Sequence, residues 1–180
     1  MKGIVFTEFL TMVEDTFGFN VADKIVNEAE LESGGVYTGV GTYSHSEIVQ
    51  LVSNLSEEKG IPVPDLLEAF GKYLFPRFVE GYNDMLTGFT DCFSLLEHIE
   101  NHIHVEVKKL YPDAELPTFE ADRSGDEKLT LTYRSTRKMS RLAVGLIKAC
   151  GEHFQEDLSV QEEAVVADGS VVNILVTKNQ

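Results

Sequence analysis

TFEADRSGDEKLTLTYRSTR, residues 118–137, is the stretch that decides the fold class of this chain. From Leu129 to Tyr133 it alternates large apolar residues with threonine, which is the two-residue repeat of a half-buried strand. Ser124-Gly125-Asp126 supplies a turn from an earlier strand near residues 118–122. The stretch therefore predicts a β-hairpin.

A second hairpin is expected downstream of this one. Strands at about 158–166 and 171–177 are joined across Asp168-Gly169, a favoured turn pair. Between the two hairpins, from about Ser140 to Phe154, apolar residues recur at helical spacing. The C-terminal part is therefore predicted as strand, strand, helix, strand, strand, with an antiparallel sheet.

Upstream of residue 112 the chain has apolar residues at three- and four-residue spacing, which indicates helices. Ser44 or Ser46 can cap one helix, and Pro64-Asp65 suits the first turn of another that runs to about Phe75, before Pro76. The last long helix is expected from Leu95 to Tyr111.

Helices followed by hairpins predict an α+β fold, with a helical N-terminal part packed on a C-terminal part that holds a four-stranded antiparallel sheet. No repeat or flexible linker interrupts the sequence. We expect one domain over residues 1–180, with a helical subdomain at about 1–60 and a second subdomain with helices and sheet at about 61–180.

Charge and apolar content restrict the partners. Fifteen Lys and Arg against thirty Asp and Glu give a formal net charge of −15, so nucleic acid and anionic membranes are poor partners. No apolar run approaches the roughly 20 residues of a membrane span, and Glu8 interrupts the apolar start that a signal peptide needs. A cytoplasmic protein is expected, with Cys92 and Cys150 as buried thiols.

Three histidines, His98, His102 and His104, lie on the predicted helix 95–111. At about 100° per residue, His98 points away from the apolar face, His102 lies off to one side, and His104 sits on the other shoulder. A neutral imidazole there suits a metal held by a macrocycle. A surface or hydrogen-bonded core histidine is the alternative from geometry alone.

The end of the strand carries Tyr133, Ser135 and Arg137. If the strand repeat continues, these three side chains share the face of Leu129 and Leu131. Two hydroxyls and a guanidinium beyond an apolar row suit a ligand with an apolar body and carboxylates at one edge. A strand end that emerges into solvent would give the same pattern.

Taken together, these segments resemble the H-NOX family of haem nitric-oxide/oxygen-binding domains. The resemblance is carried by Tyr133-x-Ser135-x-Arg137, by HVEVKKLYPD at 104–113, by Gly145-Leu146-Ile147 and by the start MKGI. It implies that His104 is the proximal iron ligand and that Tyr133, Ser135 and Arg137 bind the haem propionates. No Cys-x-x-Cys-His occurs, so the resemblance implies haem b, protohaem IX, held non-covalently between the two parts of the domain.

The resemblance also bears on the gas. Oxygen binders of the family carry a tyrosine nine positions after the motif tyrosine, and Leu142 stands there; Phe9 and Leu74 take two other positions that are polar or indole-bearing in those relatives. Bound oxygen gains from a hydrogen-bond donor, whereas nitric oxide binds ferrous haem without one. The resemblance therefore implies a nitric-oxide sensor. It also implies that the steric walls of the gas pocket are formed by Val5, Phe78, Pro117 and Leu142.

By resemblance, nitric oxide weakens the iron–histidine bond and the domain rearranges, so the expected output is a changed surface and not a reaction. The expected partner is a separate histidine kinase or cyclic-di-nucleotide enzyme. Three other hypotheses stay open: an oxygen sensor or carrier, a histidine-metal hydrolase on His98 and His102, and a haem-free interaction module. No structural zinc is expected, because Cys150 and His153 alone are too few ligands.

Overall fold

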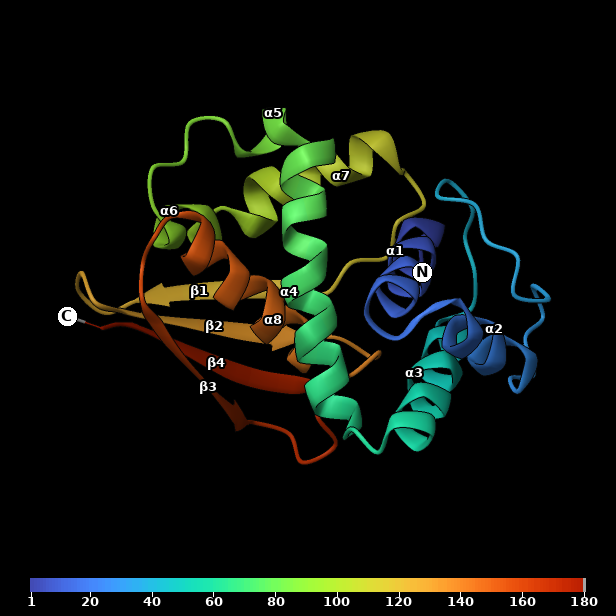
Figure 1. Cartoon of the computed structure of the whole chain (residues 1–180). Helices are drawn as coiled ribbons and strands as arrows, with labels where there is room; N and C mark the ends of the chain where they lie inside the picture. Colours follow the sequence, from blue (N-terminus) through green and yellow to red (C-terminus); the bar gives the residue numbers. More distant parts are fainter. Residues whose placement is uncertain (180) are drawn as a thin grey trace. The chain divides into compact units, whose positions relative to one another are not determined.

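The computed structural model describes residues 1–179, with the backbone only at position 85. The chain divides into two compact units, Met1–Phe70 and Gly71 to the end of the described residues, and each unit is described by itself. The boundary falls inside one helix, α4, Val63–Gly81. The α+β class predicted from the sequence is confirmed (Figure 1).

The first unit is helical. It contains α1 (Gly3–Phe17), α2 (Phe19–Asn27), α3 (His45–Lys59) and the first part of α4. The Ser44 side chain accepts a hydrogen bond from the Ser46 N–H and caps α3, and Gly60 ends that helix with φ +66°. The core is formed by fully buried apolar side chains, which include Phe6, Phe9, Val13, Ile25, Leu51 and Leu55.

A buried carboxylate fixes the long connection between α2 and α3. Glu47 is 3% exposed, and its two oxygens accept hydrogen bonds from the Ser33 backbone N–H at 3.2 Å, the Ser33 hydroxyl at 2.5 Å and the Tyr37 hydroxyl at 2.6 Å. A buried charge is tolerated only when its acceptors are satisfied in this way. The sequence pattern gave no indication of this cluster.

The second unit holds the rest of α4, four short helical segments, one longer helix and the sheet. The helical segments are α5 (Asn83–Leu86), α6 (Cys92–Glu97), the π-helix η1 (Ile99–Ile103) and α7 (His104–Leu110), and they precede β1 (Thr118–Arg123), β2 (Lys128–Arg134), α8 (Ser140–His153), β3 (Leu158–Ala164) and β4 (Val171–Lys178).

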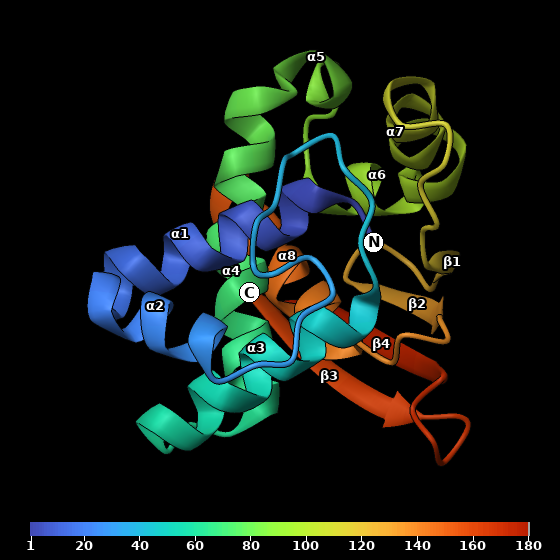
Figure 2. The same ribbon diagram turned by 90° about the vertical axis from the view of Figure 1, so that its right-hand side faces the viewer.

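The sheet has the order β1-β2-β4-β3, and every neighbouring pair is antiparallel (Figure 2). Tyr133 of β2 stands between Phe119 of β1 and Val172 of β4 in the register. Alternate residues of β2 and β4 point to one face and form the core of this unit with α6 and α8, including both buried cysteines, Cys92 and Cys150.

Two helix expectations were wrong. The helix expected to end at about Phe75 continues through Pro76 to Gly81, because Phe75 and Val79 pack on the core and offset the one backbone hydrogen bond that proline cannot donate. The single helix expected from Leu95 to Tyr111 is divided into α6, η1 and α7, since His98 departs from helical geometry at φ −107°, ψ 12°.

Glycine allows α4 and α8 to touch backbone to backbone. A Cβ atom at Gly71 would lie 2.2 Å from the carbonyl oxygen of Leu142 and 2.9 Å from the Cα of Gly145. No side chain fits in that space, so the contact requires glycine at position 71.

Candidate functional site

A π-helical turn stands directly before His104. Its backbone bonds span five residues: the Ile103 N–H donates to the His98 carbonyl, and the His104 N–H donates to the Ile99 carbonyl. Such a turn holds more residues than an α-helical turn, and it occurs often at functional sites. The α-helical angles from which the histidine directions were predicted therefore do not apply here.

His104 has one ring nitrogen engaged. Its Nδ1 lies 3.0 Å from Oε1 of Glu100, and its side chain is 13% exposed. Burial lowers the pKa of His104 and outweighs the opposing effect of Glu100, so the neutral ring is favoured at pH 7. With the Nδ1 proton donated to Glu100, Nε2 carries the lone pair, and no described residue forms a hydrogen bond with it.

The other two histidines have a different environment. The rings of His98 and His102 both lie against Phe89, at centroid distances of 5.6 and 5.5 Å. His98 also uses Nδ1 in a 2.7 Å contact with the Ser94 carbonyl oxygen. Both rings therefore pack on Phe89, whereas the His104 ring packs on Phe119.

Phe119 connects His104 to Tyr133. The Phe119 ring lies 6.0 Å from the His104 ring and 5.6 Å from the Tyr133 ring, centroid to centroid, and Phe119 is the cross-strand partner of Tyr133. The structure thus brings the two predicted site elements together through a residue that sequence reasoning did not select. The predicted hairpin pairing was the one signal that pointed to it.

The Tyr-x-Ser-x-Arg group is only partly on the strand. Strand β2 ends at Arg134, so the expectation that Ser135 and Arg137 continue its face was wrong: both lie in the following loop, because the chain turns there toward α8. The Tyr133 hydroxyl accepts the Met139 N–H at 3.0 Å, and Ser135 Oγ accepts the Arg137 N–H at 3.1 Å. Both hydroxyl protons remain available to a ligand.

The Arg137 side chain binds the carboxylate of Glu115. Its guanidinium donates to the Glu115 carbonyl oxygen at 2.6 Å and to Glu115 Oε2 at 3.0 Å. The Arg137 side chain is 13% exposed, whereas that of Glu115 is 87% exposed. A pair with so exposed a partner is worth little, so a ligand carboxylate can replace Glu115. A carboxylate-bearing macrocycle with a metal that needs one imidazole fits these residues.

The model of haem-NO-binding domains matches residues 2–162. The chain belongs to this family. It is a haem-binding gas-sensor domain and not an enzyme, and the structures it resembles are those of H-NOX proteins. In the part of the chain that the structure describes, no three His, Cys, Asp or Glu side chains gather as metal ligands, and no helix is long and apolar enough to cross a membrane.

Three solved H-NOX structures share the fold over nearly the whole chain. The Fe(II) unliganded protein from K. algicida is 44% identical with a TM-score of 0.96, covering 100% of this chain and 97% of that one. The protein from Shewanella woodyi, bound to IWP-051 in the Fe(II)CO state, is 42% identical with a TM-score of 0.83, covering 99% and 95%. The protein from S. oneidensis in the Fe(II)NO state is 26% identical with a TM-score of 0.92, covering all of both chains.

A curated relative is much longer than this chain. Soluble guanylate cyclase gcy-35 of Caenorhabditis elegans is 27% identical over 145 residues, which cover 76% of this chain. The aligned part is 20% of the cyclase, so the chain spans about a fifth of that relative.

The expected distal residues of this H-NOX chain belong to different units. Phe9 is fully buried in the first unit against Phe70, at 5.2 Å between ring centroids, and Val5 on the same helix is half-buried. The second unit holds the remaining ones, of which Leu74 is buried and the others are half-buried: Leu74, Phe78, Pro117 and Leu142.

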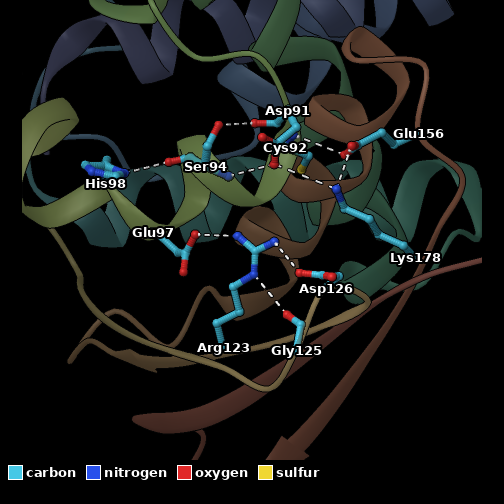
Figure 3. A network of polar contacts seen from close by, with 10 residues as sticks. All are labelled: Asp91, Cys92, Ser94, Glu97, His98, Arg123, Gly125, Asp126, Glu156 and Lys178. Carbon is cyan, nitrogen blue, oxygen red and sulfur yellow. Dashed lines mark hydrogen bonds and ion pairs between the residues drawn. The ribbon is translucent and has the colours of Figure 1, made fainter.

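Helix α6, which leads into the π-turn, is tied to the sheet by two ion-pair groups (Figure 3). At its start, Asp91 lies 3.7 Å from Lys178 Nζ, and Glu156 lies 2.6 Å from the same nitrogen. At its end, Glu97 accepts from Arg123 Nη1 at 3.0 Å. Since Lys178 ends β4 and Arg123 ends β1, the helix before the proximal segment is fixed to two strands.

Proposed function

We propose that this chain binds haem b non-covalently through His104, senses nitric oxide at the ferrous iron, and passes the signal to a separate protein. The whole chain would act as one haem-binding domain, with a helical subdomain at about 1–60 and a helical and sheet subdomain at about 61–180. The carrying observation is that the His104 ring, anchored at Nδ1 by Glu100, lies against Phe119 and through it reaches Tyr133, whereas the rings of His98 and His102 lie against Phe89.

Different residues would bind different parts of the haem. His104 would supply Nε2 to the iron, and Arg137 would exchange Glu115 for a propionate. The hydroxyls of Tyr133 and Ser135 keep a proton to donate to the same carboxylates. Pro117 stands directly before β1 and would pack against the haem plane, as the family resemblance implies.

When bound, ferrous haem would supply the gas-binding chemistry, and His104 would be the protein ligand whose bond to the iron responds to nitric oxide. The protein then decides which gas is retained. Leu142 offers no hydrogen-bond donor, and Phe9, Leu74, Phe78 and Val5 are apolar as well. An oxygen ligand, which carries partial negative charge, would lose the hydrogen bond that stabilises it, whereas nitric oxide would not.

The signal would leave through a changed surface. A shift of His104 must pass to η1 and α7, because α6 before them is held by the ion pairs to β1 and β4. The expected partner is a histidine kinase or a cyclic-di-nucleotide enzyme. With a net charge of −15, the domain favours a basic docking patch on that partner.

His104→Gly tests the ligand assignment. The variant should bind haem poorly and recover the wild-type Soret spectrum when free imidazole is supplied, since imidazole can fill the space of the missing ring. His102→Gly is the matched control and should keep the wild-type spectrum. An unchanged spectrum in the His104 variant, or its loss in the His102 variant, would contradict the assignment.

A further inference from the structure

One oxygen atom of Glu100 serves two partners. Oε1 lies 3.0 Å from His104 Nδ1, and it also accepts the backbone N–H of Phe119 at 2.8 Å. Glu100 is part of η1, and its side chain is 41% exposed. If the His104 ring served only to pack the interior, it would require neither of these two hydrogen bonds.

We propose that Glu100 is a positioning residue that sets the strength of the bond between His104 and the haem iron. This inference depends on the proposed function, in which His104 is the iron ligand. A carboxylate that accepts the Nδ1 proton fixes the tautomer with Nε2 free, holds the ring in one orientation and makes Nε2 a stronger donor.

The second hydrogen bond fixes the carboxylate itself. Strand β1 is an edge of the sheet, so an N–H on its outer side has no strand to pair with. Glu100 takes up the N–H of Phe119, and Phe119 pairs with Tyr133 on β2. The carboxylate therefore has a fixed position relative to the hairpin that leads into the propionate-binding group.

The π-turn places the two side chains together. Glu100 and His104 are four residues apart across the junction of η1 and α7, and the wide turn brings residues four and five apart onto one face. His104 lies with its ring toward Phe119, and Glu100 lies between the helix and the strand. The turn thus positions the ligand and its hydrogen-bond acceptor in one step.

The consequence is a threshold for the sensor. If Nε2 of His104 is a stronger electron donor to the iron, nitric oxide weakens the iron–histidine bond less. Glu100 would therefore raise the nitric-oxide concentration needed to release His104. Removing the negative charge should weaken the iron–histidine bond while His104 stays in place. Partial exposure of Glu100 to water screens this effect but does not remove it.

The experiment uses the full-length ferrous, haem-loaded protein and three variants. Glu100→Gln keeps the shape and an acceptor oxygen but removes the charge, and Glu100→Ala removes both hydrogen bonds. Glu106→Gln is the matched control, because Glu106 is two residues from His104 but pairs with Lys109 on the surface. The iron–histidine stretching frequency from resonance Raman spectra is the primary measurement, and the rate of haem release is the second.

We expect a lower frequency in Glu100→Gln, and haem release at least about tenfold faster in Glu100→Ala, since loss of a hydrogen bond behind a metal ligand costs 10- to 100-fold in affinity. Glu106→Gln should match the wild type in both. A frequency in Glu100→Gln equal to that of the wild type would overturn the inference, even if Glu100→Ala unfolds more easily. If the wild-type spectrum lacks an iron–histidine band, the proposed function fails instead.

Discussion

Replacing Arg137 with alanine removes the strongest donor for a ligand carboxylate, and the structure allows its cost to be worked out. In the structure the guanidinium makes one hydrogen bond to the Glu115 backbone and one ion pair to its exposed side chain. These contacts stabilise the fold by about 1–2 kcal/mol together. With haem bound, loss of a charge pair that is largely desolvated costs about 2–5 kcal/mol, and the 13% exposure of Arg137 favours the lower half, about 2–3 kcal/mol.

That energy corresponds to haem binding weaker by about 30- to 150-fold. Transfer of haem to excess apomyoglobin, followed at the Soret band, measures the loss, and urea unfolding of the haem-free protein measures stability separately. Arg134→Ala is the control: its side chain is 51% exposed and lies 3.7 Å from Glu120, so its removal should change either quantity by less than about 0.5 kcal/mol. Haem release from Arg137→Ala at the rate of Arg134→Ala would refute the propionate assignment.

Two further predictions concern gas choice and acid stability. Leu142→Tyr should move the ferrous protein toward lasting oxygen binding, because one hydrogen bond to a partly charged ligand is worth about 1.5–3 kcal/mol. Leu142→Phe lacks the hydroxyl and should not bind oxygen in this way. A stable oxygen spectrum of the wild-type protein would contradict the nitric-oxide assignment. Glu47→Gln should destabilise the haem-free protein at pH 7 by about 1–3 kcal/mol, whereas the exposed Glu57→Gln should not. Burial raises the pKa of Glu47, but the hydrogen bonds from Ser33 and Tyr37 together lower it by more, so the folded pKa lies below the ordinary value of 4.5. The stability that Glu47 contributes is therefore present above pH 4.5 and is lost as the pH falls through its folded pKa. In that acid range the unfolding free energies of the wild type and Glu47→Gln, measured by urea titration, should converge. An equal difference between these two free energies at all pH values would exclude this role for Glu47.

Much of the second unit could be predicted from short stretches of sequence. The alternation from Leu129 to Tyr133 and the Asp168-Gly169 turn determined both hairpins, because strand period and turn geometry depend on residues within a few positions. The Ser44 cap marked the start of α3 for the same reason. The candidate site followed from recognisable residues at a fixed spacing, His104 and the Tyr133 group, once the family resemblance gave them roles.

Other features were decided by tertiary contacts between residues far apart in the sequence. Pairing of β2 with β4 joins the two hairpins into one sheet, and core packing carries α4 through Pro76. No local pattern indicates the π-turn or the Glu100 carboxylate between His104 and Phe119. A π-helical turn is rarer than an α-helical one, and here tertiary contacts stabilise it: Glu100 binds the Phe119 N–H of the edge strand, and the His102 ring packs against Phe89. The sequence by itself therefore determined the local elements and the candidate residues of the site, and the tertiary structure decided that Glu100 engages Nδ1 of His104.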